Sequence, residues 1–236
     1  TAGMIGPGDT GGSFPGWPSR TLEFDGTNWS TGGNYPTAGN SIGFCGKAHN
    51  TQMGVGANLN NPTSNIAATY DGTNWTAANP YPVSIAGAWG AGTQTASVWA
   101  GGGEGPPGGS APYPTESREF DGTNFSAGGS MPTARANMRG CGTQTAALMW
   151  GSSTAYPSPS FPTATKSQSI EYDGTSWTAG GSLVKDSSGG GGCGTQTAGF
   201  MFTPAVSPQT VNCKYDGTAW ATDASNATAR PNAAGF

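Results

Sequence analysis

Short apolar stretches alternate with turn-forming residues along the whole chain. Each stretch is about six residues long, and glycine or proline stands at its ends, as in "ASVWAGGG" and "AALMWGSS". Stretches of this length between helix-breaking residues favour strands over helices. The pattern therefore predicts an all-β fold of many short strands.

The phrase "EFDGTNWSTGG" at residues 23–33 recurs four more times in close copies. Every copy contains an Asp-Gly pair, and the aspartates are spaced by 46, 50, 52 and 43 residues. A self-similar unit of this length indicates a solenoid or a propeller. The repeat aspartates are Asp25, Asp71, Asp121, Asp173 and Asp216.

Each unit predicts four strands. A Gly-rich strand precedes "GTQT", or "GKAH" in the divergent first copy, and an apolar strand follows it. A third strand ends in Tyr-Asp-Gly or Phe-Asp-Gly, and a fourth begins at the aromatic residue after that turn. Two tight turns per unit thus alternate with longer connections, as in the blades of a propeller.

The two ends of the chain complement each other in this repeat. The last unit stops where "GTQT" should follow, and the opening "TAGMIG" matches "TAGFMF" at 197–202. An open solenoid needs polar end caps, whereas here one blade can take strands from both ends. We expect a five-bladed β-propeller of four-stranded blades, forming a single domain over 1–236. The closing blade spans 1–38 plus 230–236, and the others span about 39–85, 86–135, 136–187 and 188–229.

The repeated aspartate fits a turn better than a catalytic or calcium-binding group. Asp-Gly between apolar stretches is a strong hairpin signal, because such turns need a positive φ that glycine adopts freely. The carboxylate can also accept backbone N–H groups within the turn. Catalysis does not require five equivalent copies on five blades.

An aromatic residue stands three positions after each repeat glycine. A ring of sugar-stacking platforms is one interpretation, and packing between neighbouring blades is the other. One copy in every blade favours packing. The residues are Trp29, Trp75, Phe125, Trp177 and Trp220.

Composition and charge narrow the choice of partners. The chain has Gly 41 and Pro 18, yet Trp 8, Phe 9 and Tyr 7 are spread along it, which argues against disorder. The net charge is −4 and the basic residues are scattered, so no electrostatic footprint for nucleic acid or an anionic membrane exists. No run approaches the roughly 18 apolar residues of a membrane span. We expect no nucleic-acid partner and no membrane insertion.

Residues that carry chemistry are few. His49 is the only histidine, and the acids outside the repeat form no pair in sequence. Cys45, Cys141 and Cys193 share one repeat position on different blades, and Cys213 stands in another strand. Equivalent positions on separate blades lie too far apart for a disulfide, so free buried thiols are expected. We predict no catalytic residues, no metal, no cofactor and no enzyme activity.

The order of strands and turns in "MPTARANMRGCGTQTAALMWG" followed by "SIEYDGTSWTAGG" resembles the kelch repeat. The arginine of that repeat is present only as Arg135 and Arg230, whereas Gly39, Ile85 and Ser187 stand at the equivalent places. More narrowly, "EYDGTSWTAGGSL" with "GCGTQTAG" is similar to tandem repeats in structural and tail-associated proteins of marine bacteriophages. The resemblance implies a propeller that belongs to a virion.

Length variation between units is confined to the connections between second and third strands. Strand alternation places these loops and the blade-to-blade connections on one face, called here the loop-bearing face, and the DGT and GTQT turns on the other. Aromatic residues among prolines and small polar residues resemble an adaptable recognition surface, and packing over the loop bases is the equal alternative. The candidate ligand-binding residues are Phe14, Trp17, Tyr35, Tyr81, Tyr113, Tyr156 and Phe161.

These features favour a non-enzymatic structural or receptor-binding module on the virion surface. Its loop-bearing face would contact a host-surface glycan or another virion protein. The alternatives are a stand-alone, extracellular lectin-like protein and, less favoured, a kelch-like or glycan-cleaving enzyme. The fold by itself does not decide among them.

Overall fold

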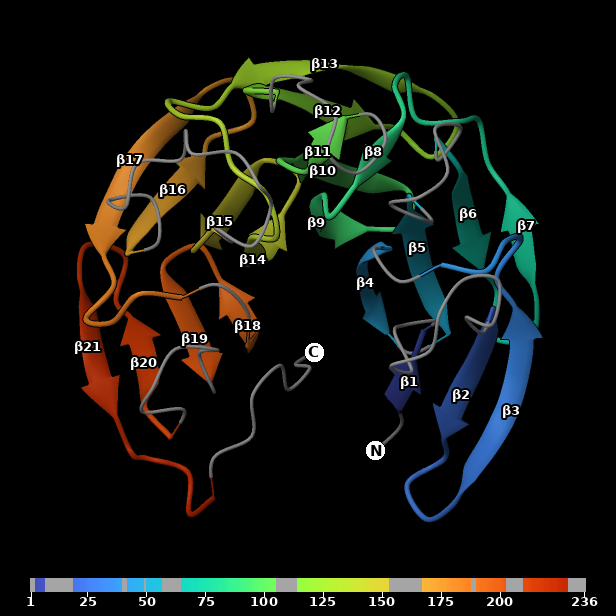
Figure 1. Ribbon diagram of the computed structural model, residues 1–236, viewed down its shortest axis with the longest axis horizontal. Coiled ribbons are helices and arrows are strands. Elements are labelled where there is room, and N and C mark those ends of the chain that lie inside the picture. The colour runs from blue at the N-terminus through green and yellow to red at the C-terminus, as the bar shows by residue number, and fades with distance from the viewer. Residues whose placement is uncertain are drawn as a thin grey trace.

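The structure, a computed structural model, describes residues 3–6, 19–39, 42–48, 50–56, 65–104, 114–152, 167–187, 190–202 and 210–228. Its strands form a five-bladed β-propeller, and the described residues contain no helix (Figure 1). The all-β class and the propeller architecture predicted from the repeat are confirmed.

The blades are antiparallel sheets of strands that follow one another in the chain. Blade I contains β1 (Gly3–Ile5), β2 (Arg20–Phe24) and β3 (Trp29–Asn34). Blade II contains β4 (Gly43–Ala48), β5 (Thr51–Val55), β6 (Ala67–Tyr70) and β7 (Trp75–Ala77). Blade III contains β9 (Trp89–Thr93), β10 (Ala96–Ala100), β12 (Glu116–Phe120) and β13 (Phe125–Ser130).

The last two blades have the same order. Blade IV contains β14 (Arg139–Thr143), β15 (Ala146–Trp150), β16 (Gln168–Tyr172) and β17 (Trp177–Ser182). Blade V contains β18 (Gly191–Thr195), β19 (Ala198–Phe202), β20 (Asn212–Tyr215) and β21 (Trp220–Asp223). In blade I three strands are described, and residues 230–236, which were expected to add its fourth strand, lie outside the described ranges.

One small sheet departs from the repeat. Strands β8 (Ile85–Ala86) and β11 (Gly103–Glu104) pair with each other and with no blade. They flank the inner half of blade III, because β8 leads into β9 and β11 follows β10. The connections around blade III therefore carry structure beyond the common pattern.

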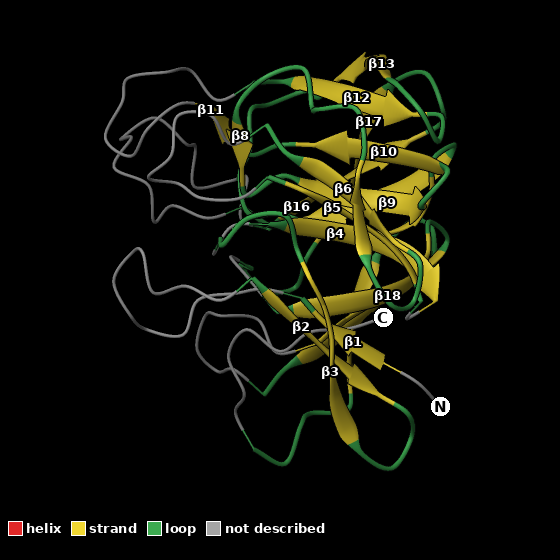
Figure 2. Ribbon diagram, turned by 90° about the vertical axis from the view of Figure 1, so that its right-hand side faces the viewer, coloured by secondary structure: helices red, strands yellow, loops and turns green. Residues whose placement is uncertain are grey.

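The core lies between the blades. The inner strands β4, β9, β14 and β18 contact one another in this order around the centre of the ring. The three apolar clusters each join side chains of two neighbouring blades, for example Val98 and Met149, or Leu148 and Met201. Figure 2 shows the ring from its edge, with strands running from one face toward the other. Burial between sheet faces is thus what holds the ring together.

The Asp-Gly turns have the conformation that the sequence predicts. The five repeat glycines have φ between 92° and 104°. In blades II to V, the Asp-Gly turn lies beside the turn that joins the first two strands of the same blade. In blade IV, for example, a Cβ placed on Gly174 would lie 3.2 Å from the Thr145 side chain. The DGT and GTQT turns therefore share one face of the ring.

Candidate functional site

The repeat aspartates cap their own turns. Asp173 Oδ1 accepts the backbone N–H groups of Thr175 and Ser176 at 2.8 and 2.7 Å. The same two contacts recur in all five turns. These N–H groups hold the pKa of each carboxyl below its ordinary value. The larger effect comes from the N–H of the third residue after the aspartate, and the smaller from that of the second. Five exposed carboxylates, each committed to its own turn, support the structural role.

The aromatic residues after these turns bind neighbouring blades. The indole N–H of Trp75 donates to Thr21 Oγ1 of the preceding blade at 2.8 Å. Trp177 and Trp220 make the same contact, to Ser117 at 3.0 Å and Ser169 at 3.1 Å. These three tryptophans therefore pack and bond between blades, as the repetition suggested.

Phe125 and Trp29 differ from the other three. Phe125 packs edge-on against Tyr81, which lies in the connection that follows blade II. Trp29 stacks on Phe24 of its own blade and leaves 53% of its surface exposed. The packing interpretation thus holds at four of the five positions.

A second contact between blades joins tyrosine to glutamate. Tyr70 O–H donates to Glu23 of the preceding blade at 2.7 Å, and Tyr172 donates to Glu119 at the same distance. Tyr215 donates likewise to Glu171. These pairs were not predicted from the sequence, although the units show a tyrosine directly before the repeat aspartate and a glutamate two residues before that aspartate.

Glutamine side chains connect blades II–III, III–IV and IV–V at the turn face. The Gln144 amide donates to the carbonyls of Ser97 and Phe120 in blade III, at 3.3 and 3.1 Å. Gln94 and Gln196 bind the carbonyls of their preceding blades in the same way. The glutamine of "GTQT" thus has a structural function in the ring.

The cysteines are free thiols, as predicted. Cys45, Cys141 and Cys213 are buried, whereas Cys193 is half-buried. Burial raises the pKa of Cys45 and Cys141 to about 12 and that of Cys213 to about 11. A thiol that stays protonated at neutral pH is a poor nucleophile, so these three are unsuited to catalysis.

Two arginines at the start of blade IV and in the connection before it bind other parts of the protein. Arg135 is fully buried, and its guanidinium donates to the backbone carbonyl of Gln168 in blade IV at 2.8 Å and to the amide oxygen of the same residue. Arg139 lies over the Trp89 ring at 4.7 Å and donates from Nε to the Gly190 carbonyl at 2.9 Å. Both side chains connect neighbouring blades.

The proposed ligand-binding aromatics fall into two groups. Tyr35 and Tyr81 are each 2% exposed. Tyr35 packs edge-on against Trp75 and donates to the Gly56 carbonyl, so it serves packing rather than ligand contact. The remaining candidates, together with His49 and Arg230, lie outside the described residues: Phe14, Trp17, Tyr113, Tyr156 and Phe161.

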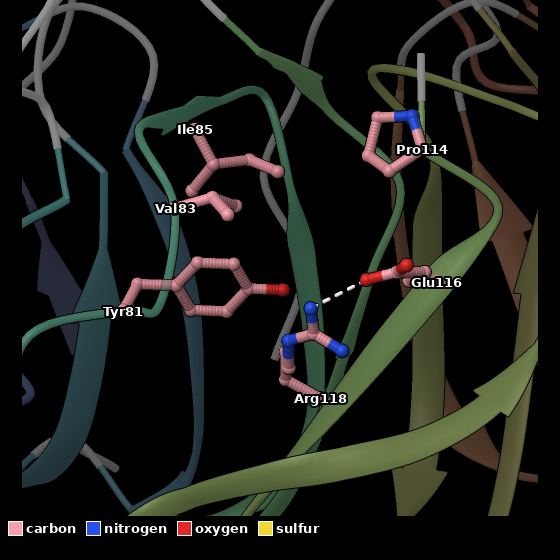
Figure 3. Close-up of a pocket in the computed structure, with 6 residues that line it drawn as sticks. All are labelled: Tyr81, Val83, Ile85, Pro114, Glu116 and Arg118. Carbon is pink, nitrogen blue, oxygen red and sulfur yellow. Dashed lines mark hydrogen bonds and ion pairs between the residues drawn. The ribbon is translucent and has the colours of Figure 1, made fainter. Parts of the chain in front are cut away.

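A shallow pocket lies on the loop-bearing face between blades II and III (Figure 3). It is open to solvent, and its enclosed part measures about 10 Å³, which is room for about one water molecule. One wall is apolar, and the other carries an ion pair between Arg118 and Glu116, toward which the Tyr81 hydroxyl points. The lining residues are Tyr81, Val83, Ile85, Pro114, Glu116 and Arg118.

Arg118 breaks the repeat at this position. Two side chains of β12, Glu116 and Arg118, supply the charges of the pocket, and Arg118 also donates to the Ser117 carbonyl at 3.4 Å. At the equivalent place, three residues before the repeat aspartate, the other units carry Leu22, Ala68, Ile170 and Cys213. The hollow is too small to enclose a sugar ring, so an amphipathic group would lie against the apolar wall and the charged pair rather than inside the pocket.

Among the described residues, no group of three or more His, Cys, Asp or Glu side chains has metal-binding geometry. Within the same residues, no helix has the length and apolarity needed to cross a membrane. Comparison with protein-family models and with curated protein sequences finds no match for this chain.

Proposed function

We propose that this propeller is a non-enzymatic recognition module of a virion, which binds a host-surface glycan or another virion protein through its loop-bearing face. The observation that carries the proposal is the contrast between the two faces. The turn face repeats the same aspartate and glutamine contacts around the ring. The loop-bearing face holds the departures: the extra β8–β11 sheet and the Glu116–Arg118 pocket.

The pocket favours a glycan or a polar protein loop over a purely apolar ligand. Val83, which is partly exposed, offers an apolar contact surface, while Arg118 and Glu116 offer a donor and an acceptor for hydroxyl groups. Glu116 is exposed, so its carboxylate is accessible without opening the blades. This arrangement also suits the lectin-like alternative, and the two differ in whether the chain is part of a virion.

The test is a binding screen against host-surface glycans and purified virion proteins with three variants. Arg118→Ile introduces the residue that blade IV carries at the equivalent position, so the fold should persist while affinity falls about tenfold or more. Trp17→Ala and Tyr156→Ala probe the long loops. Thr123→Ala, in the turn of the same blade on the opposite face, is the control.

Each outcome bears on the proposal. Loss of binding in Arg118→Ile assigns the contact to the pocket, and loss only in the loop variants moves it elsewhere on the same face. Binding that survives all three variants but falls in Thr123→Ala contradicts the assignment of the face. Turnover of a polysaccharide would instead support the enzyme alternative.

A further inference from the structure

Each contact between blades requires two matching residues. Three interfaces place a tyrosine against a glutamate: I–II, III–IV and IV–V. At interface II–III, Phe120 replaces the tyrosine and Thr69 replaces the glutamate. Hydroxyl and carboxylate are therefore both present or both absent at every described interface.

The indole contact follows the same rule. Trp75, Trp177 and Trp220 each meet a Ser or Thr hydroxyl of the preceding blade. At interface II–III, Phe125 lacks the N–H, and Ala67 at the acceptor position lacks the hydroxyl. Donor and acceptor again change together.

Blade I exposes the face that every other blade buries against its predecessor. Ile5 is 47% exposed, whereas Trp99, Met149 and Met201 at the equivalent register positions are fully buried in the inter-blade clusters. Trp29 on the same face is 53% exposed. This face of blade I is apolar. In blades II to V the equivalent face is covered by the preceding blade.

Blade V carries the residues that match this face. Opposite Phe24, which has no hydroxyl, the equivalent position in blade V is Lys214, which has no carboxylate. Opposite Trp29, which has an N–H, the equivalent position is Asn212, whose side-chain oxygen can accept. Blade V is also the ring neighbour of blade I on that side (Figure 1).

We propose that blade V of the same chain covers the exposed face of blade I. In this fifth interface the Trp29 indole donates to Asn212 Oδ1, and the Phe24 ring lies against Lys214. Asn212 Oδ1 already accepts from Asn226 at 3.2 Å, and a carbonyl-type oxygen has a second lone pair for the indole.

The fifth interface then resembles the one between blades II and III, because both lack the tyrosine–glutamate bond and the glycine of the fourth strand. Where a glycine stands in the fourth strand, the next turn approaches closely, and a Cβ on Gly181 would lie 2.6 Å from the Thr218 carbonyl oxygen. Blade V has Ala224 at that position, and blade II has Asn79. Asn79 bonds through its side chain to Asn124 of blade III, so an interface of this type forms without the glycine.

A double-variant cycle tests the pairing by restoring the missing contact. Phe24→Tyr and Lys214→Glu are made singly and together, and thermal unfolding gives the Tm. The Tm shift of the double variant, relative to the parent chain, should be more positive than the sum of the two single-variant shifts. Tyr215→Phe with Glu171→Thr, at interface IV–V, is the reference cycle, because its hydrogen bond is present in the structure. Phe24→Tyr with Thr69→Glu is a mismatched control, expected to show no coupling.

The position of Trp29 gives an independent readout. The tryptophan fluorescence spectrum of the parent chain minus that of Trp29→Phe reports the Trp29 indole alone. If blade V covers this indole, the difference spectrum should be blue-shifted. A water-like difference spectrum overturns the proposal, as does absent coupling in the test cycle beside normal coupling in the reference. Coupling that appears only in dimers, with a Tm that rises with protein concentration, assigns the face to a second copy instead.

Discussion

At the scale of single residues, Gly174 and Asp173 show why the same four-residue turn recurs. The carboxylate binds two backbone N–H groups, and the glycine supplies a φ of 92°. A side chain at that φ is strained, and here it would also meet Thr145 of the adjacent turn at 3.2 Å. The turn therefore depends on both residues of the Asp-Gly pair.

Gly174→Val should lower the free energy of unfolding by about 1–3 kcal/mol, because a β-branched residue is forced into the left-handed region. Chemical denaturation monitored by circular dichroism measures this. Gly174→Asn is the matched control, since asparagine tolerates a positive φ better than valine does and should cost less. Equal stability of the valine variant and the parent would rule out the turn assignment.

At the scale of strands and blades, one aromatic residue connects two sheets. Trp177 is 5% exposed, stacks on Tyr172 with ring centroids 4.7 Å apart, and donates to Ser117 of the preceding blade. Its removal leaves a cavity and takes the indole donor away from the Ser117 hydroxyl, which keeps its own bond to the Gly129 carbonyl. The two losses can be separated, because Phe125 occupies the equivalent position in blade III and packs there without an indole N–H.

Trp177→Ala should cost about 3–5 kcal/mol of unfolding free energy, through the cavity left between blades III and IV. Trp177→Phe keeps most of the packing and loses the hydrogen bond, so about 1 kcal/mol is expected. Equilibrium denaturation of both variants gives the comparison. If Trp177→Ala lost no more unfolding free energy than Trp177→Phe, the packing of the Trp177 indole would contribute little to stability.

Strands were predictable from the sequence because their ends are marked locally. Glycine, the Asp-Gly pair and "GTQT" fix where each strand stops, and these signals act within a few residues. The Tyr70–Glu23 bond spans 47 positions and exists only after two blades have packed. The burial of Tyr35 and Tyr81 also depends on the opposing blade. A single unit shows such residues but not what faces them.

The pocket was still harder to foresee. Glu116 and Arg118 stand two residues apart on one strand, which places both side chains on the same face. The apolar wall comes from the connection after blade II, more than 30 residues earlier, as in Val83. Alignment of the repeat units does reveal Arg118 as the charged member among apolar equivalents, and this was the available signal.

At the scale of the whole molecule, the tyrosine–glutamate pairs make the ring sensitive to alkali. Burial, then the hydrogen bond to the glutamate, raises the pKa of Tyr70, Tyr172 and Tyr215 from an ordinary 10.0 to about 12. A raised pKa means that the folded ring holds these protons more tightly than the unfolded chain. The stability they contribute is therefore complete below pH 10 and declines as the pH rises toward 12.

We expect unfolding free energy to fall through this window, with tyrosinate absorbance appearing together with the loss of the β-sheet signal. The variant Tyr70→Phe/Tyr172→Phe/Tyr215→Phe should be less stable at neutral pH but should lose less stability between pH 10 and 12, because three of the shifted groups are gone. It places at three interfaces the phenylalanine that Phe120 supplies at interface II–III, so the packing of the rings is preserved while three glutamates lose their tyrosine donor. An alkaline transition of unchanged size in the triple variant would assign the sensitivity to other groups.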